Sequence, residues 1–260
     1  MYRFSKTIIS IWFLIVLLQM FSCSQKLPEE ITGDTPAQEI IELGDMSFGK
    51  GYYNRAGEYY LEVSQFHPYS ALESKALFKA VDAFYRARKY EKTRLAANKF
   101  LLNYSNTKEA EQVFYTKAWS YCKEILNVDR DQSAAKNCIT NLKRFVSLYP
   151  SSKNKQNAKV QITSAQEFLV GQELTIAKYY LERKNPSAAI RRLKDIQKTL
   201  KSSKFLPETA YRLVEAYLMM GLMDNASSEL KKMEKEFPDS SWTLEGSRLI
   251  TKFRPTKIAD

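Results

Sequence analysis

The sequence contains little glycine, proline, histidine and cysteine, and these shortages exclude several kinds of protein. Eight glycines and eight prolines among 260 residues argue against an all-β fold, which needs many turns. The single histidine, His67, precedes Pro68 at an expected helix end, and there is no Ser/His/Asp grouping, glycine-rich phosphate loop or Cys/His cluster with metal-ligand spacing. Asp129 and Asp131 lack the glycine and terminal glutamate of a calcium loop. We therefore predict a protein that is not an enzyme and holds no cofactor and no metal ion.

The N-terminal segment contains an apolar run that is too short to cross a membrane. Ile8 to Leu18 is apolar apart from one serine and follows a positively charged start, whereas a spanning helix needs about 20 apolar residues. This pattern predicts a cleaved export signal over residues 1–22. Cys23 follows a small residue and resembles the bacterial lipoprotein box, in which the cysteine receives lipid chains and becomes the new N-terminus. The alternative is a plain signal peptide with an incidental cysteine. Residues 23–35 then form the lipidated cysteine and a flexible tether.

The net charge does not identify one class of partner, and the two remaining cysteines can be free or bonded. The precursor carries a formal charge of +11, and removal of the two positive charges in residues 1–22 leaves +9. Such a surplus suits anionic lipid, acidic proteins or nucleic acid, but export argues against nucleic acid, and the scattered lysines indicate a solvated basic surface. Cys122 and Cys138 fall on apolar helix faces, and the compartment permits a disulfide. Because buried thiols behave as small hydrophobes, we expect both to be free.

A repeat predicts the fold. From Ala37 onward the chain consists of pairs of amphipathic helices, in which a small residue of the first helix precedes one of the second by twelve positions. These pairs are Gly44 with Ala56, Val81 with Thr93, Ala177 with Ala189, and Val214 with Ala226. In the third copy Ala118 and Cys138 are twenty apart, because eight residues enlarge the turn around residues 126–131. The pattern resembles the tetratricopeptide repeat. It predicts an all-α, right-handed solenoid of about five such helix pairs over residues 36–238, followed by a capping segment and tail over residues 239–260.

Two runs of the sequence resemble a more specific family. Residues 127–132, followed by Phe145–Ser152, are similar to the third repeat and enlarged turn of the BamD family of outer-membrane lipoproteins, and Ala177–Arg183, followed by Ala189–Leu193, is similar to its fourth repeat. The resemblance covers nearly all of the mature chain. It implies a subunit of the β-barrel assembly machine that is lipid-anchored at the periplasmic face of the outer membrane. Such a subunit binds the barrel insertase through its POTRA domains and assists folding and insertion of unfolded outer-membrane proteins.

The resemblance also suggests which residues contact these partners. Arg192 matches a family arginine associated with communication to the POTRA domains, and Arg191 is its neighbouring partner-binding candidate. Substrate is expected in a groove lined by repeats one to three, where the candidate residues are Tyr53, Tyr60, Phe84 and Tyr85. Each of these aromatic residues can instead be a core residue, and Arg192 can instead be a solvated helix position.

Other binding functions remain as alternatives. A periplasmic repeat scaffold that coordinates cell-envelope enzymes is the first, although such proteins commonly lack a lipid cysteine or carry an added coiled coil. Glycan-binding outer-membrane lipoproteins with similar repeats are the second, but they usually need a much longer chain to hold a sugar site. Copurification distinguishes these functions, because the protein would retain an insertase, a murein enzyme or a glycan transporter, respectively, if it is an assembly factor, a scaffold or a glycan-binding protein.

Overall fold

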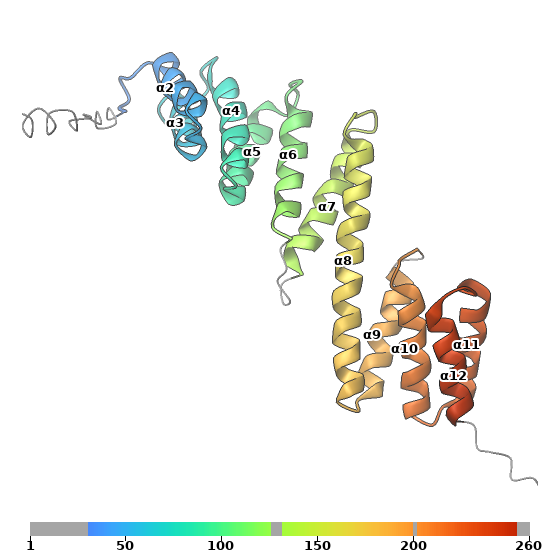
Figure 1. Ribbon diagram of the computed structural model, residues 1–260. Coiled ribbons are helices and arrows are strands. Elements are labelled where there is room, and N and C mark those ends of the chain that lie inside the picture. The colour runs from blue at the N-terminus through green and yellow to red at the C-terminus, as the bar shows by residue number, and fades with distance from the viewer. Residues whose placement is uncertain (1–30, 126–131, 200–201, 254–260) are drawn as a thin grey trace, which may run out of the picture.

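The computed structural model describes residues 31–125, 132–199 and 202–253, and within these ranges the chain forms eleven α-helices and no strand. The helices follow one another as antiparallel neighbours (Figure 1). They are α2 (Ala37–Gly49), α3 (Tyr53–Phe66), α4 (Glu73–Arg86), α5 (Tyr90–Tyr104), α6 (Ala110–Lys123), α7 (Ser133–Leu148), α8 (Lys155–Glu182), α9 (Pro186–Thr199), α10 (Leu206–Met219), α11 (Met223–Glu236) and α12 (Ser241–Phe253). The predicted all-α fold is confirmed. None of the described helices is long and apolar enough to cross a membrane.

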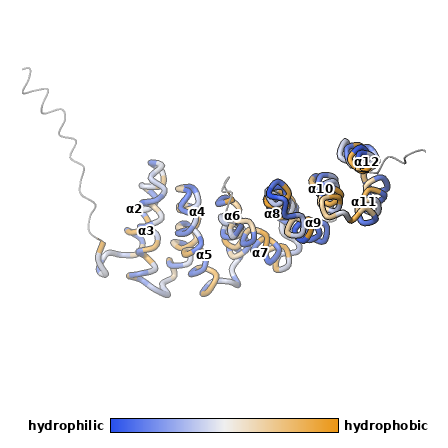
Figure 2. The backbone as a smooth tube through the Cα atoms, turned by 90° about the horizontal axis from the view of Figure 1, so that it is seen from below, coloured by the Kyte–Doolittle hydropathy of each residue, from blue (hydrophilic) through white to orange (hydrophobic). Residues whose placement is uncertain are grey.

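The helices form two layers. Figure 2 shows the first helices of the pairs, from α2 to α10, along one side of the molecule and the second helices, from α3 to α11, along the other. Each helix packs on the next one in the chain, and first helices also contact each other, α4 with α6 and α10 with α12. The first helices therefore form a surface that crosses more than one repeat, as expected for a solenoid.

The same helix-to-helix turn recurs in four repeats. The chain takes a positive φ at Gly51, Arg88, Lys184 and Gly221. The next residue then donates its backbone N–H to a carbonyl five positions earlier, as from Tyr52 to Ser47 and from Lys89 to Phe84. This left-handed end of a helix favours glycine, which has no Cβ to clash. Gly51 and Gly221 therefore mark the turn in the sequence, whereas Arg88 and Lys184 adopt it without that signal.

Small residues at the predicted positions let paired helices approach closely. Ala56, Thr93, Ala189 and Ala226 are completely buried. A Cβ on Gly44 would overlap the ring of Tyr60, and one on Gly57 would come within 2.6 Å of the ring of Phe84. At these two helix contacts, a glycine on one helix leaves room for a large ring on the next helix.

Helix α8 joins two halves of the solenoid. It is a single helix of 28 residues, as the spacing of its apolar residues predicts. Its first half packs on α7 through Ala158, Ile162 and Ala165, in the same core as Phe145. Its second half belongs to a different core, which it shares with α9 and α10. Because the two halves of α8 have different partners, the C-terminal repeats are shifted along α8 relative to the N-terminal ones (Figure 1).

The prediction of two free thiols is wrong, because Cys122 and Cys138 form a disulfide. Each cysteine lies on a buried helix face, as the sequence indicates, but α6 and α7 are antiparallel neighbours and these two faces meet. Their Cα atoms are 4.8 Å apart, a distance that a disulfide spans. The bond closes the base of the enlarged turn. Residues 126–131 of that turn, with Asp129 and Asp131, lie outside the described residues, as does Cys23.

Candidate functional site

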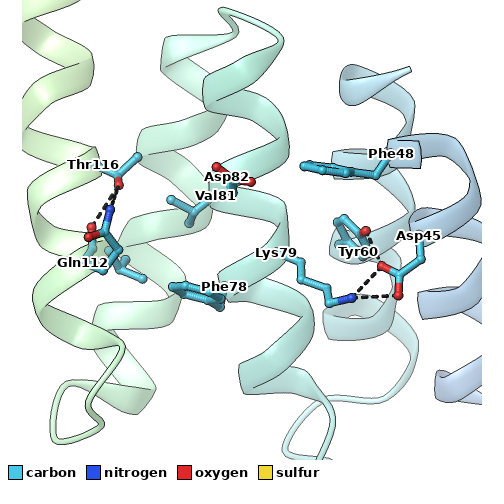
Figure 3. A pocket seen from close by; sticks show the side chains of 10 residues that line it. Asp45, Phe48, Tyr60, Phe78, Lys79, Val81, Asp82, Gln112 and Thr116 are labelled. Carbon is cyan, nitrogen blue, oxygen red and sulfur yellow. Dashed lines mark hydrogen bonds and ion pairs between the residues drawn. The ribbon is translucent and has the colours of Figure 1, made fainter. Parts of the chain in front are cut away.

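A groove crosses the first three repeats on the side formed by the first helices. It is a hollow of about 340 Å³ between α2, α4 and α6, with Tyr60 of α3 beneath it. Its floor is apolar and its rim is polar (Figure 3). The floor consists of Phe48, Tyr60, Phe78, Val81 and Val113, and the rim consists of Asp45, Lys79, Asp82, Gln112 and Thr116. The groove can accept an apolar side chain and offers polar groups to the backbone on either side of it.

The charged groups at one rim of the groove neutralise each other. Lys79 Nζ lies 2.6 and 2.7 Å from the two carboxylate oxygens of Asp45, and the Tyr60 hydroxyl donates to the same carboxylate at 2.5 Å. Burial raises the pKa of Asp45, but the hydrogen bonds from Lys79 and Tyr60 outweigh it and leave this pKa below its ordinary value. Burial and Asp45 raise the pKa of Tyr60, so the phenol stays protonated. Asp82 is paired with Arg86 at 2.9 Å. The rim therefore favours uncharged, apolar ligands over strongly charged ones.

The four predicted substrate residues have different surroundings. Tyr60 lies in the groove. Phe84 has no exposed surface and is a core residue, because Gly57 leaves room for its ring. Tyr53 packs edge-on against Phe48 and borders a separate hollow. Tyr85 is half-buried beside Tyr90, and burial with neighbouring tyrosines raises the pKa of Tyr85 to about 12.

Other groove residues are not among the predicted substrate residues, although the sequence contains a signal for them. Asp45 and Asp82 lie 37 residues apart, each directly after the small residue of its first helix. Phe78 precedes the corresponding small position by three residues, so it lies one helical turn away on the same face. Extending the repeat register to every position of the first helices, and not only to its small and aromatic ones, would have selected these residues.

The predicted partner residues lie at the junction of the two halves. Arg192 of α9 donates from Nη1 to Glu173 Oε2 of α8 at 2.6 Å, and both side chains are 30% exposed. The other carboxylate oxygen of Glu173 accepts a hydrogen bond of 2.8 Å from Gln132, directly before α7. The guanidinium also lies over the ring of Tyr180. Burial raises the pKa of Glu173, but hydrogen bonds from Gln132 and Arg192 outweigh this effect and lower it overall.

Glu173 thus connects the third repeat with the fourth, and Arg192 is part of that connection. Arg191, in contrast, is exposed. It lies one helical turn after Ser187, whose hydroxyl contacts the sulfur of Met220. Met219, Met220 and Leu222 are exposed at the turn between α10 and α11. We call Arg191, Met219, Met220 and Leu222 the C-terminal surface, because it joins the fourth repeat to the fifth. It combines apolar side chains with a cation, which is typical of protein interfaces.

A family model and curated relatives indicate one family. The model of the family YfiO, described as an outer membrane lipoprotein, matches residues 33–233. The outer membrane protein assembly factor BamD of Caulobacter vibrioides is 29% identical over 225 residues, which cover 86% of this chain and 74% of that relative. BamD of Rickettsia prowazekii is 26% identical over 242 residues, which cover 93% of this chain and 96% of that relative. Among solved structures, that of MamA protein is similar at 13% identity with a TM-score of 0.35, covering 86% of this chain and 98% of that one.

Proposed function

Because the chain belongs to the YfiO family of outer membrane lipoproteins, we propose that it is an outer-membrane protein assembly factor of the β-barrel assembly machine. The observation that carries this proposal is the family match over residues 33–233, joined by relatives that are named as assembly factors. In this function the protein acts by binding and not as an enzyme. It binds the barrel insertase and assists unfolded outer-membrane proteins in folding and insertion.

The groove of the first three repeats is the substrate site in this proposal. Unfolded outer-membrane proteins present strands in which apolar and polar side chains alternate. An apolar side chain of such a strand fits over Phe48 and Phe78. Gln112 donates from Nε2 to Thr116 Oγ1, and its Oε1 can accept a hydrogen bond from the backbone of the strand. The neutral pair of Lys79 and Asp45 makes no demand for a charged ligand.

The C-terminal repeats bind the insertase through its POTRA domains. The C-terminal surface supplies apolar contact, and Arg191 supplies a charge that is exposed to a partner. A guanidinium has five N–H donors, so Arg192 can pair with Glu173 and still donate to a carboxylate of the insertase. Arg192 then has two roles, because it also holds α9 against α8.

The lipid anchor of the protein is Cys23, after removal of residues 1–22, and the domain faces the periplasm. This part of the proposal is supported by the family description and by the sequence pattern around Cys23. It is tested by fractionating cells that express Cys23→Ala. We expect the variant to leave the membrane fraction, and a variant that stays attached, with a lipid-modified peptide elsewhere, would contradict the assignment.

The proposed function is tested by copurification from detergent-solubilised membranes. The wild-type protein should retain the insertase, whereas capture of murein enzymes would favour the scaffold function instead. Arg191→Glu and Arg192→Glu should both reduce retention, and Lys231→Glu on α11 serves as a control with the same charge change. If both arginine variants fold, retain the insertase and assemble barrels like wild type, the insertase interface lies elsewhere.

The substrate site needs its own test. A photo-crosslinking amino acid at Gln112, in the groove, should capture unfolded outer-membrane proteins during their assembly. The same amino acid at the exposed position Asn98, on the second helix of repeat two, provides the control. Equal capture from both positions would show that the groove is not the site.

A further inference from the structure

Positive charge is concentrated in one segment of the chain. Residues 132–166 contain six lysines and arginines and neither aspartate nor glutamate. This stretch of 35 residues therefore supplies more than half of the formal charge of +11 of the whole sequence. A solvated surface of scattered lysines, which the composition suggests, does not describe this segment.

Five of these cations surround the turn between α7 and α8, at the upper end of α8 in Figure 1. Two lie in the last turns of α7, one in the connecting turn and two in the first turns of α8. We call them the cationic tip, which consists of Lys143, Arg144, Lys153, Lys155 and Lys159. Four of them are exposed, and Lys155 is half-buried, with its ammonium group on the carbonyl of Pro150. None of the five forms an ion pair with a residue that the structure describes.

The cations are crowded at this end of the molecule. Arg144 and Lys117 of α6 each lie 5.7 Å from the centre of the Phe114 ring. Burial and the charge of Arg144 lower the pKa of Lys117. The acidic residue nearest to this ring in the chain, Glu111, accepts a hydrogen bond from Ser152. Glu111 balances only part of this positive charge, and an anionic partner would relieve the repulsion among the remaining cations.

Apolar side chains lie among the cations. Leu148, the last residue of α7, is 53% exposed, and Val160 of α8 is 56% exposed. Four of the five cations are lysines, which are hydrated point charges and suit a diffuse anionic surface better than paired contacts to single carboxylates. Lysines around exposed apolar residues are typical of protein segments that lie on a membrane surface. Cations without exposed apolar neighbours would suit an acidic protein as well as a membrane.

We propose that the cationic tip binds the anionic phospholipid headgroups of the membrane, with Leu148 in the headgroup layer. A lipid anchor would raise the effective concentration of this surface and strengthen a weak contact. That strengthening rests on the proposed anchor, but the headgroup contact itself does not depend on the assembly function. The contact would hold the middle of the solenoid at the membrane and thereby orient the groove.

The test uses the mature chain with Cys23→Ser, so that no acyl chain contributes, and vesicles of phosphatidylcholine with or without phosphatidylglycerol. We expect binding to the anionic vesicles at about 0.1 M salt and weaker binding as salt rises. A cation near an anionic membrane contributes about 1 kcal/mol, or about fivefold in binding. Replacing Lys143, Lys153 and Lys159 by Gln should thus weaken binding about 100-fold. Leu148→Ser should weaken it severalfold with the same salt dependence.

The matched control replaces Lys231, Lys235 and Lys252 by Gln, which removes the same charge at α11 and α12. This variant should bind within about twofold of wild type, because a headgroup contact is local. Melting temperatures show that each variant is folded. Equal losses in both triple variants, equal binding to pure phosphatidylcholine, or no binding to anionic vesicles would overturn the proposal. Binding to soluble polyglutamate as tightly as to the anionic vesicles, with no loss in Leu148→Ser, would overturn it in favour of an acidic protein partner.

Discussion

The N-terminal and C-terminal halves of the solenoid share one repeat and fill it with different side chains. The largest fully buried side chains from α2 to α5 include the rings of Tyr60, Phe84 and Phe100, whereas those from α8 to α12 are Leu193, Leu213 and Met233. Two partly buried aromatic residues, Phe48 and Phe78, pack against this ring-rich core and line the groove of the first half. The second half fills its most deeply buried positions with aliphatic side chains, and its rings, such as Tyr211 and Trp242, pack against this core while they remain partly exposed. The repeat therefore sets the backbone, and the side chains between the small positions decide what each half can bind.

Each half also contains a nearly buried carboxylate that is held by polar partners. Glu73, 1% exposed, accepts hydrogen bonds from the Ser64 hydroxyl, from the Tyr69 backbone and from the Tyr104 hydroxyl, the last two at 2.7 Å. It joins α3, α4 and α5 in this way. Glu229 in the second half accepts from Gln197 of α9 at 2.6 Å and from Lys232 of its own helix at 3.0 Å. The carboxylate of the first half thus has neutral donors, and that of the second half has a cation.

Substitutions in the two cores should have the largest effects on stability, and the aromatic core of the first half should be the more sensitive. Phe84→Ala should lower the free energy of unfolding by about 3–5 kcal/mol, because it leaves a large cavity beside Gly57. Leu213→Ala is the counterpart in the second half and should cost about 2–5 kcal/mol, toward the lower end if its aliphatic neighbours collapse. Both values come from denaturant unfolding followed by circular dichroism. A smaller loss for Phe84→Ala than for Leu213→Ala would contradict the importance assigned to the rings.

The disulfide lies in the third repeat, at the end of the N-terminal half, and should have the next largest effect on stability. Replacing Cys122 and Cys138 by Ala opens a loop with a sequence separation of 16, which costs about 3 kcal/mol in the chain-entropy model. Reductant should lower the melting temperature of wild type toward that of the double variant and leave the variant unchanged. If the intact, unreduced protein reacts with a thiol reagent at both positions after denaturation, the bond is absent.

The buried carboxylate of the first half should make stability depend on pH. Burial raises the pKa of Glu73, but hydrogen bonds from Ser64, Tyr104 and Tyr69 outweigh it and lower this pKa below 4.5. A depressed folded-state pKa stabilises the protein above the unfolded-state value, and this contribution is lost as pH falls through the folded-state value. Glu73→Gln should therefore lower stability at neutral pH and reduce the loss below about pH 4.5. Parallel pH profiles for wild type and variant would exclude the linkage.

The pair at the junction should have the smallest effect on stability. A double-mutant cycle of Glu173→Gln and Arg192→Leu should give a coupling of about 0.5–1 kcal/mol, because both side chains are partly exposed. Both single variants should nevertheless reduce insertase retention if α9 is positioned through Glu173. A coupling near zero would mean that Arg192 acts only by contacting its partner.

Much of the fold could be predicted from the sequence, whereas the candidate sites could be predicted only in part. The separation of twelve residues between Gly44 and Ala56 predicted the helix pairs, because it shows which faces of two consecutive helices meet. The same reasoning placed Tyr60 and Phe84 together as substrate candidates, but both rings are almost completely buried, and only Tyr60 also lines the floor of the groove. Periodicity identifies the buried face of a helix and does not show how much of a ring remains at its edge.

The sequence by itself determined the all-α repeat, the turn glycines and the family, because these depend on spacing within one repeat. Only the tertiary structure decided that Cys122 bonds to Cys138 and that Arg192 and Gln132 meet at Glu173. It also decided that the charges of one acid-free segment gather around a single turn. These contacts join residues 16 to 41 positions apart on different helices. They depend on how whole helices are placed against each other, which no local spacing encodes.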